Sequence, residues 1–159
     1  MKIVQIEDFF HPDAGYKINI LSKYFARMGH ETVIITAELD KMPDFLTSFF
    51  GRDNIAARDR EYEQNYGVKI IRRPICAYVS GRAIFKDDLA KLVNSLHPDV
   101  LYVHGNDTAV GMWLLRHRDR LCCPMVMDNH MVEMASQNPL RKLYRAYYRR
   151  FIAPIIIKN

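Results

Sequence analysis

The chain has 159 residues, of which 49% are hydrophobic and 26% charged, and this balance is typical of one globular domain with its own core. No apolar run approaches the ~18 residues of a membrane-spanning helix, and the three cysteines, Cys76, Cys122 and Cys123, have the wrong number and spacing for a disulfide framework or a zinc site, so we expect buried free thiols. The net charge of +5 favours anionic partners such as nucleotide phosphates or phospholipid.

The first predicted elements are a strand, a loop and a helix. Residues 2–6 (KIVQI) are short, apolar and rich in β-branched side chains, which predicts a buried strand. The loop FFHPDAGYKIN at residues 9–19 follows this strand. Apolar side chains then recur with the spacing of one helix face, at Leu21, Tyr24, Phe25 and Met28, and Gly29 is typical of a helix C-terminus.

Strands and helices continue to alternate along the chain. Strands are predicted at 31–37, 67–74, 98–105 and 124–130, and helices at 87–96 (with Asp87 as its cap), 108–118 and about 138–151. Residues 38–66 interrupt the alternation, and we expect an excursion over the sheet edge with one or two short helices. Because the strands are continuous apolar runs, they indicate parallel strands covered on both faces. The predicted fold class is α/β, a Rossmann-like, doubly wound, mostly parallel sheet in a single domain.

Ligands of open parallel sheets bind beyond the carboxyl ends of the strands, and polar residues gather at these ends here. The segments concerned are 8–17, 38–41, 72–74, 104–107 and 128–133. His104 and His130 each follow a strand, and a neutral imidazole suits hydrogen bonding to sugar hydroxyls or a proton relay. We expect a polar pocket there and no metal site, because strand exits rarely aim three ligands at one point.

The loop before the first helix permits two interpretations of Gly15. A helix N-terminus offers free N–H groups and a positive dipole end, and a glycine lets the backbone approach an anion without a Cβ clash. The loop has neither the G-x-G-x-x-G pattern of dinucleotide binding nor the P-loop pattern. From the residues alone, Gly15 is either a turn residue or one that faces a phosphate.

The last predicted helix is amphipathic and basic. Its apolar face carries Leu140, Leu143, Tyr144, Tyr147, Tyr148 and Phe151, and its other face carries Arg141, Lys142, Arg145 and Arg149. Such a helix either lies on an anionic membrane or packs on the sheet with its arginines in solvent. The tail APIIIKN is strongly apolar, and we expect a strand or a connection there.

The order of these segments resembles that of a known family. The run KIVQIEDFFHPDAGYKINILSKYFARMGHETVIITA resembles the start of a family 4 (group 1) glycosyltransferase, with its first strand, glycine loop, helix and second strand. HPDVLYVHG and PMVMDNH resemble later strands of that family, and LYRAYYRRFIAPIIIKN resembles its helix leading toward the second domain. The match covers essentially the whole chain.

The resemblance implies the N-terminal half of a two-domain GT-B enzyme. Such enzymes transfer a sugar from a nucleotide-sugar donor to an acceptor with retention of configuration and usually without a metal, so no cofactor is expected. Residues 1–159 would form the acceptor-side domain, with residues 138–159 leading toward a C-terminal donor-binding domain outside this sequence. The chain alone is expected to transfer no sugar.

The resemblance also assigns roles to individual residues. Gly15 matches the second glycine of the loop that approaches the donor diphosphate, while Ala14 replaces the first. His130 matches the histidine that contacts the donor sugar and assists the reaction. Lys17, Asn106 and Asp107 are positional candidates for acceptor contact.

The function that follows is sugar transfer to a glycan or lipid-linked acceptor, as in bacterial surface polysaccharide biosynthesis. The expected location is cytoplasmic, with peripheral contact to an anionic membrane through residues 140–152, and no nucleic-acid partner is expected. The alternative is a non-catalytic Rossmann-like module that binds a nucleotide or a protein.

Overall fold

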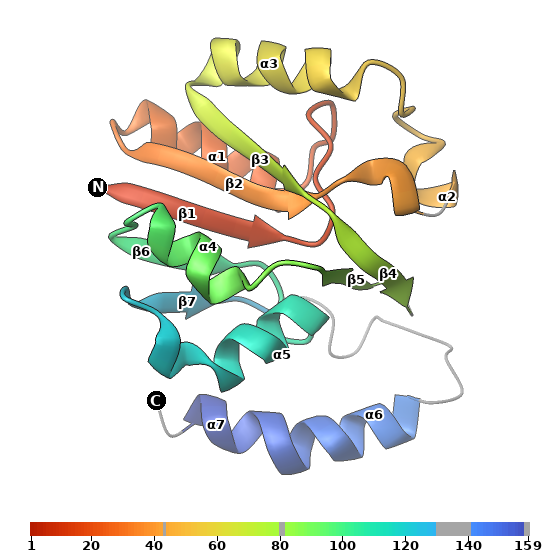
Figure 1. The fold of residues 1–159 in the computed structure, drawn as a ribbon, viewed down its shortest axis with the longest axis vertical. Helices are drawn as coiled ribbons and strands as arrows, with labels where there is room; N and C mark the ends of the chain where they lie inside the picture. The colour runs from red at the N-terminus through yellow and green to blue at the C-terminus, as the bar shows by residue number, and fades with distance from the viewer. Residues whose placement is uncertain (43, 80–81, 130–140, 158–159) are drawn as a thin grey trace.

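The computed structural model describes residues 1–42, 44–79, 82–129 and 141–157. Its centre is a five-stranded sheet in the order β3-β2-β1-β6-β7, and each neighbouring pair of strands is parallel (Figure 1). The strands are β1 (Lys2–Glu7), β2 (Glu31–Ala37), β3 (Val68–Arg73), β6 (Val100–Val103) and β7 (Met125–Met127). The predicted α/β fold with a parallel, Rossmann-like sheet is therefore confirmed.

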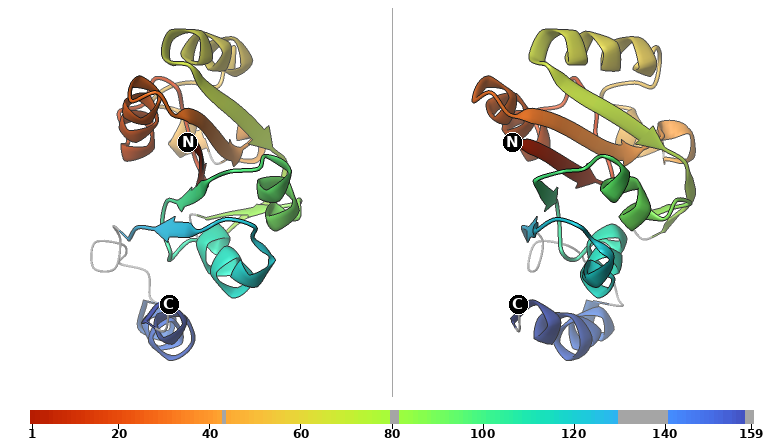
Figure 2. Two further views of the ribbon diagram at one scale, coloured as in Figure 1. Left: turned by 90° about the vertical axis from the view of Figure 1, so that its left-hand side faces the viewer. Right: turned by 60° about the vertical axis from the view of Figure 1, so that its left-hand side comes forward.

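Helices cover both faces of this sheet. The helix α1 (Lys17–Arg27) lies on one face, and α4 (Leu89–Ser95) and α5 (Ala109–Arg116) lie on the opposite face (Figure 2). The helix α3 (Ile55–Tyr66) runs beside the terminal strand β3, on the same face as α1. This layering explains the continuous apolar strands, because both faces of β1 and β2 are buried.

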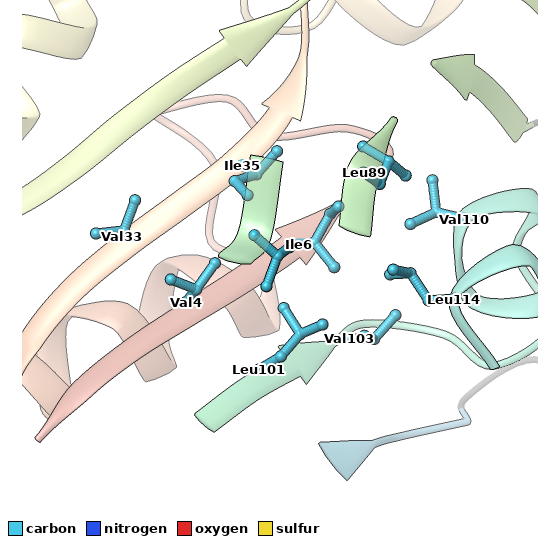
Figure 3. Packing of buried hydrophobic residues seen from close by; sticks show 10 residues of the cluster. Val4, Ile6, Val33, Ile35, Leu89, Leu101, Val103, Val110 and Leu114 are labelled. Carbon is cyan, nitrogen blue, oxygen red and sulfur yellow. The ribbon is translucent and has the colours of Figure 1, made fainter. Parts of the chain in front are cut away.

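The larger core lies between the sheet and the α4–α5 layer. Side chains at alternate positions of the strands meet those of the two helices there, as Figure 3 shows. This cluster contains Val4, Ile6, Val33, Ile35, Leu89, Val93, Leu101, Val103, Val110 and Leu114. On the other face, Ile18 of α1 and Tyr62 of α3 close over Ile34.

The helix ends follow ordinary capping chemistry, with one correction. Asp88, and not Asp87, caps α4, since its carboxylate accepts the Lys91 backbone N–H at 3.3 Å. Asp87 instead forms an ion pair with Arg73 at 2.5 Å. Gly29 follows α1 with a φ of +82°, in agreement with the predicted helix end.

The segment 38–66 does leave the sheet edge, but it holds three helical pieces. These are a 3₁₀ turn at Leu39–Lys41, the short α2 (Asp44–Thr47) and α3, which has 12 residues. An antiparallel hairpin of β4 (Ile75–Val79) and β5 (Arg82–Phe85) then follows Pro74 and was not predicted. Its strands have only five and four residues, too few for an apolar run or an alternation to mark them as strands.

The C-terminal segment is helical to residue 157. The helix α6 (Arg141–Tyr147) continues through a π-helical turn (Tyr148–Ile152) into α7 (Ala153–Ile157), and the three lie along one axis beside α5 (Figure 1). The expectation of a strand or connection in APIIIKN is therefore wrong for residues 153–157. Isoleucine's preference for strands is a weak prior that local context overrides.

The predicted apolar face of this helix is also partly wrong. Leu143 is 69% and Phe151 53% exposed, whereas Ile152 is fully buried. A π-helical turn holds about one residue more than an α-helical turn, so at Tyr148–Ile152 the residue one position later than expected faces inward. The three cysteines are free thiols, as expected, but their expected burial is wrong, because Cys76 and Cys122 are exposed and Cys123 is half-buried.

Candidate functional site

A polar cluster occupies the carboxyl ends of β1, β6 and β7, next to the N-terminus of α1. Its members come from four separate parts of the chain, as parallel topology requires of residues that share this edge. They are Gln5, Glu7 and Asp8 at the end of β1, Lys17 at the start of α1, Tyr102 and His104 at the end of β6, and Asp128 after β7. We call this set the rim cluster.

Lys17 and Asp128 form the centre of the rim cluster. Lys17 Nζ lies 2.7 Å from Asp128 Oδ2, and the same oxygen accepts the Tyr102 hydroxyl at 3.0 Å. Asp128 Oδ1 accepts the backbone N–H of Gly105 at 2.8 Å. Asp128 therefore fixes both the ammonium at the start of α1 and the loop after β6, two segments more than 80 residues apart in the sequence.

The pKa values of this pair move in opposite directions. Burial acts to raise the pKa of Asp128, but the hydrogen bonds from Lys17 and Gly105 outweigh it and hold that pKa below its ordinary value. Burial acts to lower the pKa of Lys17, and hydrogen bonds to Asp128 and Tyr102 raise it above its ordinary value. Both groups are thus charged at neutral pH, and a cation stays beside the first turn of α1.

His104 links the other carboxylates of the rim cluster. Its Nε2 lies 3.0 Å from Gln5 Oε1, and its Nδ1 lies 3.4 Å from Asp128 Oδ2 and 3.9 Å from Glu7 Oε2. Burial, and then repulsion by Asp8 and Asp128, raises the pKa of Glu7 well above its ordinary value. Glu7, beside His104, therefore takes up a proton more readily than an ordinary carboxylate does.

Asp8 points to the opposite side of the strand from Glu7 and is 4% exposed. Neither of its carboxylate oxygens has a hydrogen-bond partner of ordinary geometry among the described residues. Burial raises the pKa of Asp8 to about 7, although Arg82 and the Ala83 backbone N–H act in the other direction. Asp8 is therefore a buried acid that holds its proton up to neutral pH.

Asp8→Asn tests this assignment through the pH dependence of stability. The folded-state pKa of about 7 lies above the ordinary value of 3.8, so the folded protein binds this proton more tightly than the unfolded chain does. The stability that Asp8 contributes is present below about pH 4 and is lost as the pH rises through about 7. We expect Asp8→Asn to exceed the parent by about 4 kcal/mol at pH 8 and nearly to match it near pH 4.

Urea denaturation between these pH values measures the difference, with Asp53→Asn on the exposed surface as the matched control. Parallel pH profiles for the parent and Asp8→Asn would contradict the assignment.

Asn106 and Asp107 lie in the loop after β6, where the C-terminal helix contacts them. Asn106 Oδ1 accepts Asn129 Nδ2 at 2.6 Å and the Tyr148 hydroxyl at 2.9 Å. The backbone carbonyl of Asp107 accepts the Tyr144 hydroxyl at 3.0 Å. The predicted acceptor residues are thus engaged with other parts of the domain, and they shape the loop.

The Asp107 carboxylate is also paired, here with the hairpin. Arg82 Nη2 of β5 donates to Asp107 Oδ2 at 3.2 Å. The unpredicted hairpin thereby brings a guanidinium to the same edge as Asp8.

The glycine loop is anchored by His11 and leaves Gly15 exposed. His11 Nε2 lies 3.1 Å from Gly51 O, and its backbone carbonyl accepts both the Ala14 N–H at 3.0 Å and Asn19 Nδ2 at 2.9 Å. A Cβ added at Gly15 would meet nothing within 4 Å, and its φ is not in the left-handed region. The chain's own fold therefore gives no reason for a glycine at this position.

The predicted site residues are partly brought together. Lys17 joins the rim cluster as the first residue of α1, Gly15 directly precedes the N-cap residue Tyr16, and Ala14 is buried in the loop. His130 lies outside the described residues. Sequence reasoning did not single out Glu7, Tyr102 or Arg82; an acidic pair directly after a buried strand was the available signal for Glu7 and Asp8.

Two absences can be stated for the part of the chain that the structure describes. No group of three or more histidine, cysteine or carboxylate side chains is arranged to hold a metal ion in it. Within the same residues, no helix is both long and apolar enough to cross a bilayer.

Comparison with known proteins identifies the family. The family model described as Glycosyltransferase Family 4 matches residues 18–157. This range includes α1 from Ile18 onward, Tyr102, His104 and Asp128 of the rim cluster, and the C-terminal helix. This chain belongs to glycosyltransferase family 4. No curated protein sequence matches it. The family assignment supports a glycosyltransferase-related domain, in agreement with the resemblance that the sequence suggested.

Solved structures of similar shape are only distantly related to this glycosyltransferase family 4 chain. A universal stress protein in complex with cAMP is 16% identical over 80% of this chain and 95% of that one, with a TM-score of 0.42. A universal stress protein family member from Burkholderia pseudomallei is 15% identical over 81% and 96% of the two chains, with a TM-score of 0.41. The fold class of this chain is shown by its own parallel five-stranded sheet.

Proposed function

We propose that this chain is the acceptor-side, N-terminal domain of a two-domain GT-B glycosyltransferase. The reaction would move a sugar from a nucleotide-sugar donor to a glycan or lipid-linked acceptor with retention, and the donor would be held mainly by a C-terminal domain that follows residues 138–159. Bacterial surface polysaccharide assembly is the setting that the family suggests. The chain by itself would bind acceptor and transfer no sugar.

The observation that carries the proposal is the arrangement around the start of α1. Tyr16 is the N-cap residue, and no side chain caps the helix there. The first-turn N–H groups and the open face of Gly15 therefore lie at one place and favour an anion, and the Lys17 ammonium, paired with Asp128, lies beside them. A departing nucleoside diphosphate develops negative charge, which such donors would stabilise.

The roles of the other residues follow from their positions. Lys17 would contact the acceptor or the phosphates from the edge of the sheet. Asn106 and Asp107 would hold the neighbouring loop in the shape that the acceptor meets, since both are tied to other elements. His130 would contact the donor sugar, and no metal or other cofactor would be needed.

Gly15→Ala in the intact enzyme tests the loop assignment. The domain itself leaves free space at Gly15, so we expect no change in thermal midpoint. We expect sugar transfer to fall about tenfold or more, because a methyl group would displace the diphosphate from the first turn of α1. Transfer is measured as nucleotide release coupled to product formation.

Ala56→Ser, an exposed small-to-small change on α3, is the control for Gly15→Ala. Full transfer by Gly15→Ala would show that the loop does not lie against the donor, and a lowered thermal midpoint would show a structural role for the glycine.

His130→Ala in the intact enzyme tests the second assignment carried by the family resemblance. We expect transfer to fall about a hundredfold with an unchanged thermal midpoint, because positioned groups that assist a reaction contribute effects of that order. Rates near those of the parent would remove His130 from the mechanism. Micromolar binding of a dinucleotide by this chain, without sugar transfer by the intact protein, would instead favour the non-catalytic module.

We also propose that the C-terminal helix can touch an anionic membrane, with the protein otherwise cytoplasmic. Leu143 and Phe151 are exposed beside Lys142, Arg145, Arg149 and Arg150, and α6 and the π-helical turn contain no acidic residue. This contact would bring the domain to a lipid-linked acceptor.

A further inference from the structure

We propose that the outward face of α1, together with Phe49, is a second surface that docks on an anionic lipid membrane. It is separate from residues 140–152, and it stands whether or not the intact protein transfers sugar. We call the set Tyr16, Ile20, Tyr24, Met28 and Phe49 the α1 surface.

The α1 surface is an apolar ridge on the side of the helix that points to solvent. Tyr16 is 51%, Ile20 50%, Tyr24 56% and Met28 68% exposed, and the four are spaced by four residues. Residues four apart lie one above the other on a helix, so they form a continuous stripe. The buried side of the same helix is made by Ile18, Asn19 and Ser22, two of which are polar. A surface helix normally buries its apolar residues and exposes its polar ones, so the apolar outer face of α1 is unusual.

Aromatic contacts extend the stripe beyond the helix. The Tyr16 ring meets the Phe50 ring edge-on at 6.2 Å, and Phe50 in turn lies 6.1 Å from Phe49. Phe49 is 90% exposed, the largest such value among the exposed apolar side chains of the described residues. No described element covers the outer side of α1 in either view of Figure 2. Contiguous apolar surface of this kind marks an interaction site.

The charges around the ridge identify the occupant. α1 (KINILSKYFAR) has three cations and no acidic residue. Lys23 lies 4.0 Å from the centre of the Tyr66 ring and Arg27 5.9 Å from that of Tyr24, and neither forms an ion pair among the described residues. Asp13, in the preceding loop, is neutralised by Arg58 at 2.7 Å.

Lys17 is paired with Asp128, so within the described part of the chain the cations that flank the ridge without an ion pair are Lys23 and Arg27. Apolar and tyrosine side chains beside such cations match the boundary between lipid headgroups and acyl chains. Lys23 and Arg27 are four residues apart on one flank of the stripe, and a protein partner or a second copy would not need both to lack a carboxylate partner. An anionic bilayer uses both features, the ridge for burial and the cations for the headgroups.

The experiment measures binding of the chain to phosphatidylcholine vesicles with and without phosphatidylserine, by cosedimentation. We expect binding only with phosphatidylserine and a loss of binding as salt rises. Ile20→Ser/Tyr24→Ser should lower the partition coefficient at least tenfold, because both side chains would enter the interface. Lys23→Gln/Arg27→Gln should lower it about tenfold on anionic vesicles.

Two matched controls separate this surface from others. Ile84→Ser alters an apolar side chain of similar exposure, 43%, on β5 and should leave binding unchanged. Leu143→Ser/Phe151→Ser alters the C-terminal helix; full loss of binding there, with parental binding by Ile20→Ser/Tyr24→Ser, would overturn the proposal. Equal binding to neutral and anionic vesicles would also overturn it, as would dimerisation in sedimentation velocity that Ile20→Ser/Tyr24→Ser abolishes. Circular dichroism checks that each variant is folded.

Discussion

Replacing Gly111 by alanine is expected to lower the free energy of unfolding by about 4 kcal/mol or more, or to prevent folding. Gly111 lies in the first turn of α5, where the helix passes directly under the loop after β6. A Cβ at this position would lie 2.1 Å from Gly105 O and 3.0 Å from Asn106 Cα. Both are backbone atoms, so no flexible side chain can move aside to make room.

The consequence of Gly111→Ala reaches the candidate site. Thr108 caps α5 by accepting the Gly111 N–H at 2.8 Å, and the same hydroxyl donates to Gly105 O at 2.9 Å. A shift of α5 would therefore displace the loop that carries Asn106 and Asp107.

Urea denaturation followed by Trp113 fluorescence measures the effect of Gly111→Ala, with Gly15→Ala as the matched control. The added methyl group is the same in both variants, but at Gly15 it meets open space, so that variant should keep the parental midpoint. A loss of less than about 1 kcal/mol at Gly111 would mean that α5 and the loop separate more easily than their packing implies.

The second large effect is expected for Arg72→Met, at about 3 kcal/mol of stability. Arg72 lies near the end of β3 and links that strand to α3, to the loop after β1 and to the end of β2. Its Nε and Nη2 donate to both oxygens of Asp59 at 2.5 and 2.8 Å, and both side chains are 13% exposed. Its Nη1 also donates to Phe10 O at 3.3 Å and to Ala37 O at 3.1 Å.

Methionine keeps an unbranched apolar stem in place of the arginine methylenes but removes every donor. The Asp59 carboxylate and two carbonyls would then be left without their partner in a poorly solvated place. Because Phe10 begins the loop that contains Gly15, we also expect faster hydrogen exchange at residues 11–15 in this variant.

Arg60→Met, an exposed change on the same helix as Asp59, is the control and should alter stability by less than about 0.5 kcal/mol. The double variant Arg72→Met/Asp59→Leu should recover part of the loss, since no charge is then left unpaired. An Arg72→Met variant as stable as the parent would contradict the account of this junction.

Much of the sheet could be predicted from the sequence, because each parallel strand is a continuous apolar run. The position of α1 was equally clear, since Gly29 ends it, but the face predicted to be apolar and buried was wrong. Tyr24 and Met28 are exposed, and Ile18, Asn19 and Ser22 face the interior instead. The β4–β5 hairpin was not predictable in the same way, because its four- and five-residue strands carry no periodic pattern. The error at Phe151 and Ile152 has a different cause, a π-helical turn that local sequence does not announce.

The candidate site was predictable in location and only partly in detail. Parallel topology places every strand exit at one edge, so the meeting of Lys17 with Asp128 follows from the fold class. The protonation of Asp8 depends on burial by the hairpin that carries Arg82 and Ala83, and no sequence pattern contains that information. The structure likewise ties Asn106 to Tyr148, a contact between residues that the sequence suggested for different roles.

Turnover of nucleotide sugars, measured side by side for this chain and for the proposed two-domain protein, tests the proposed function. We expect residues 1–159 to fold and bind acceptor but release no nucleotide, whereas the two-domain protein should transfer sugar and lose most of that activity in Lys17→Met. Turnover of a nucleotide sugar by residues 1–159 alone would contradict the division of labour between acceptor-side and donor-side domains.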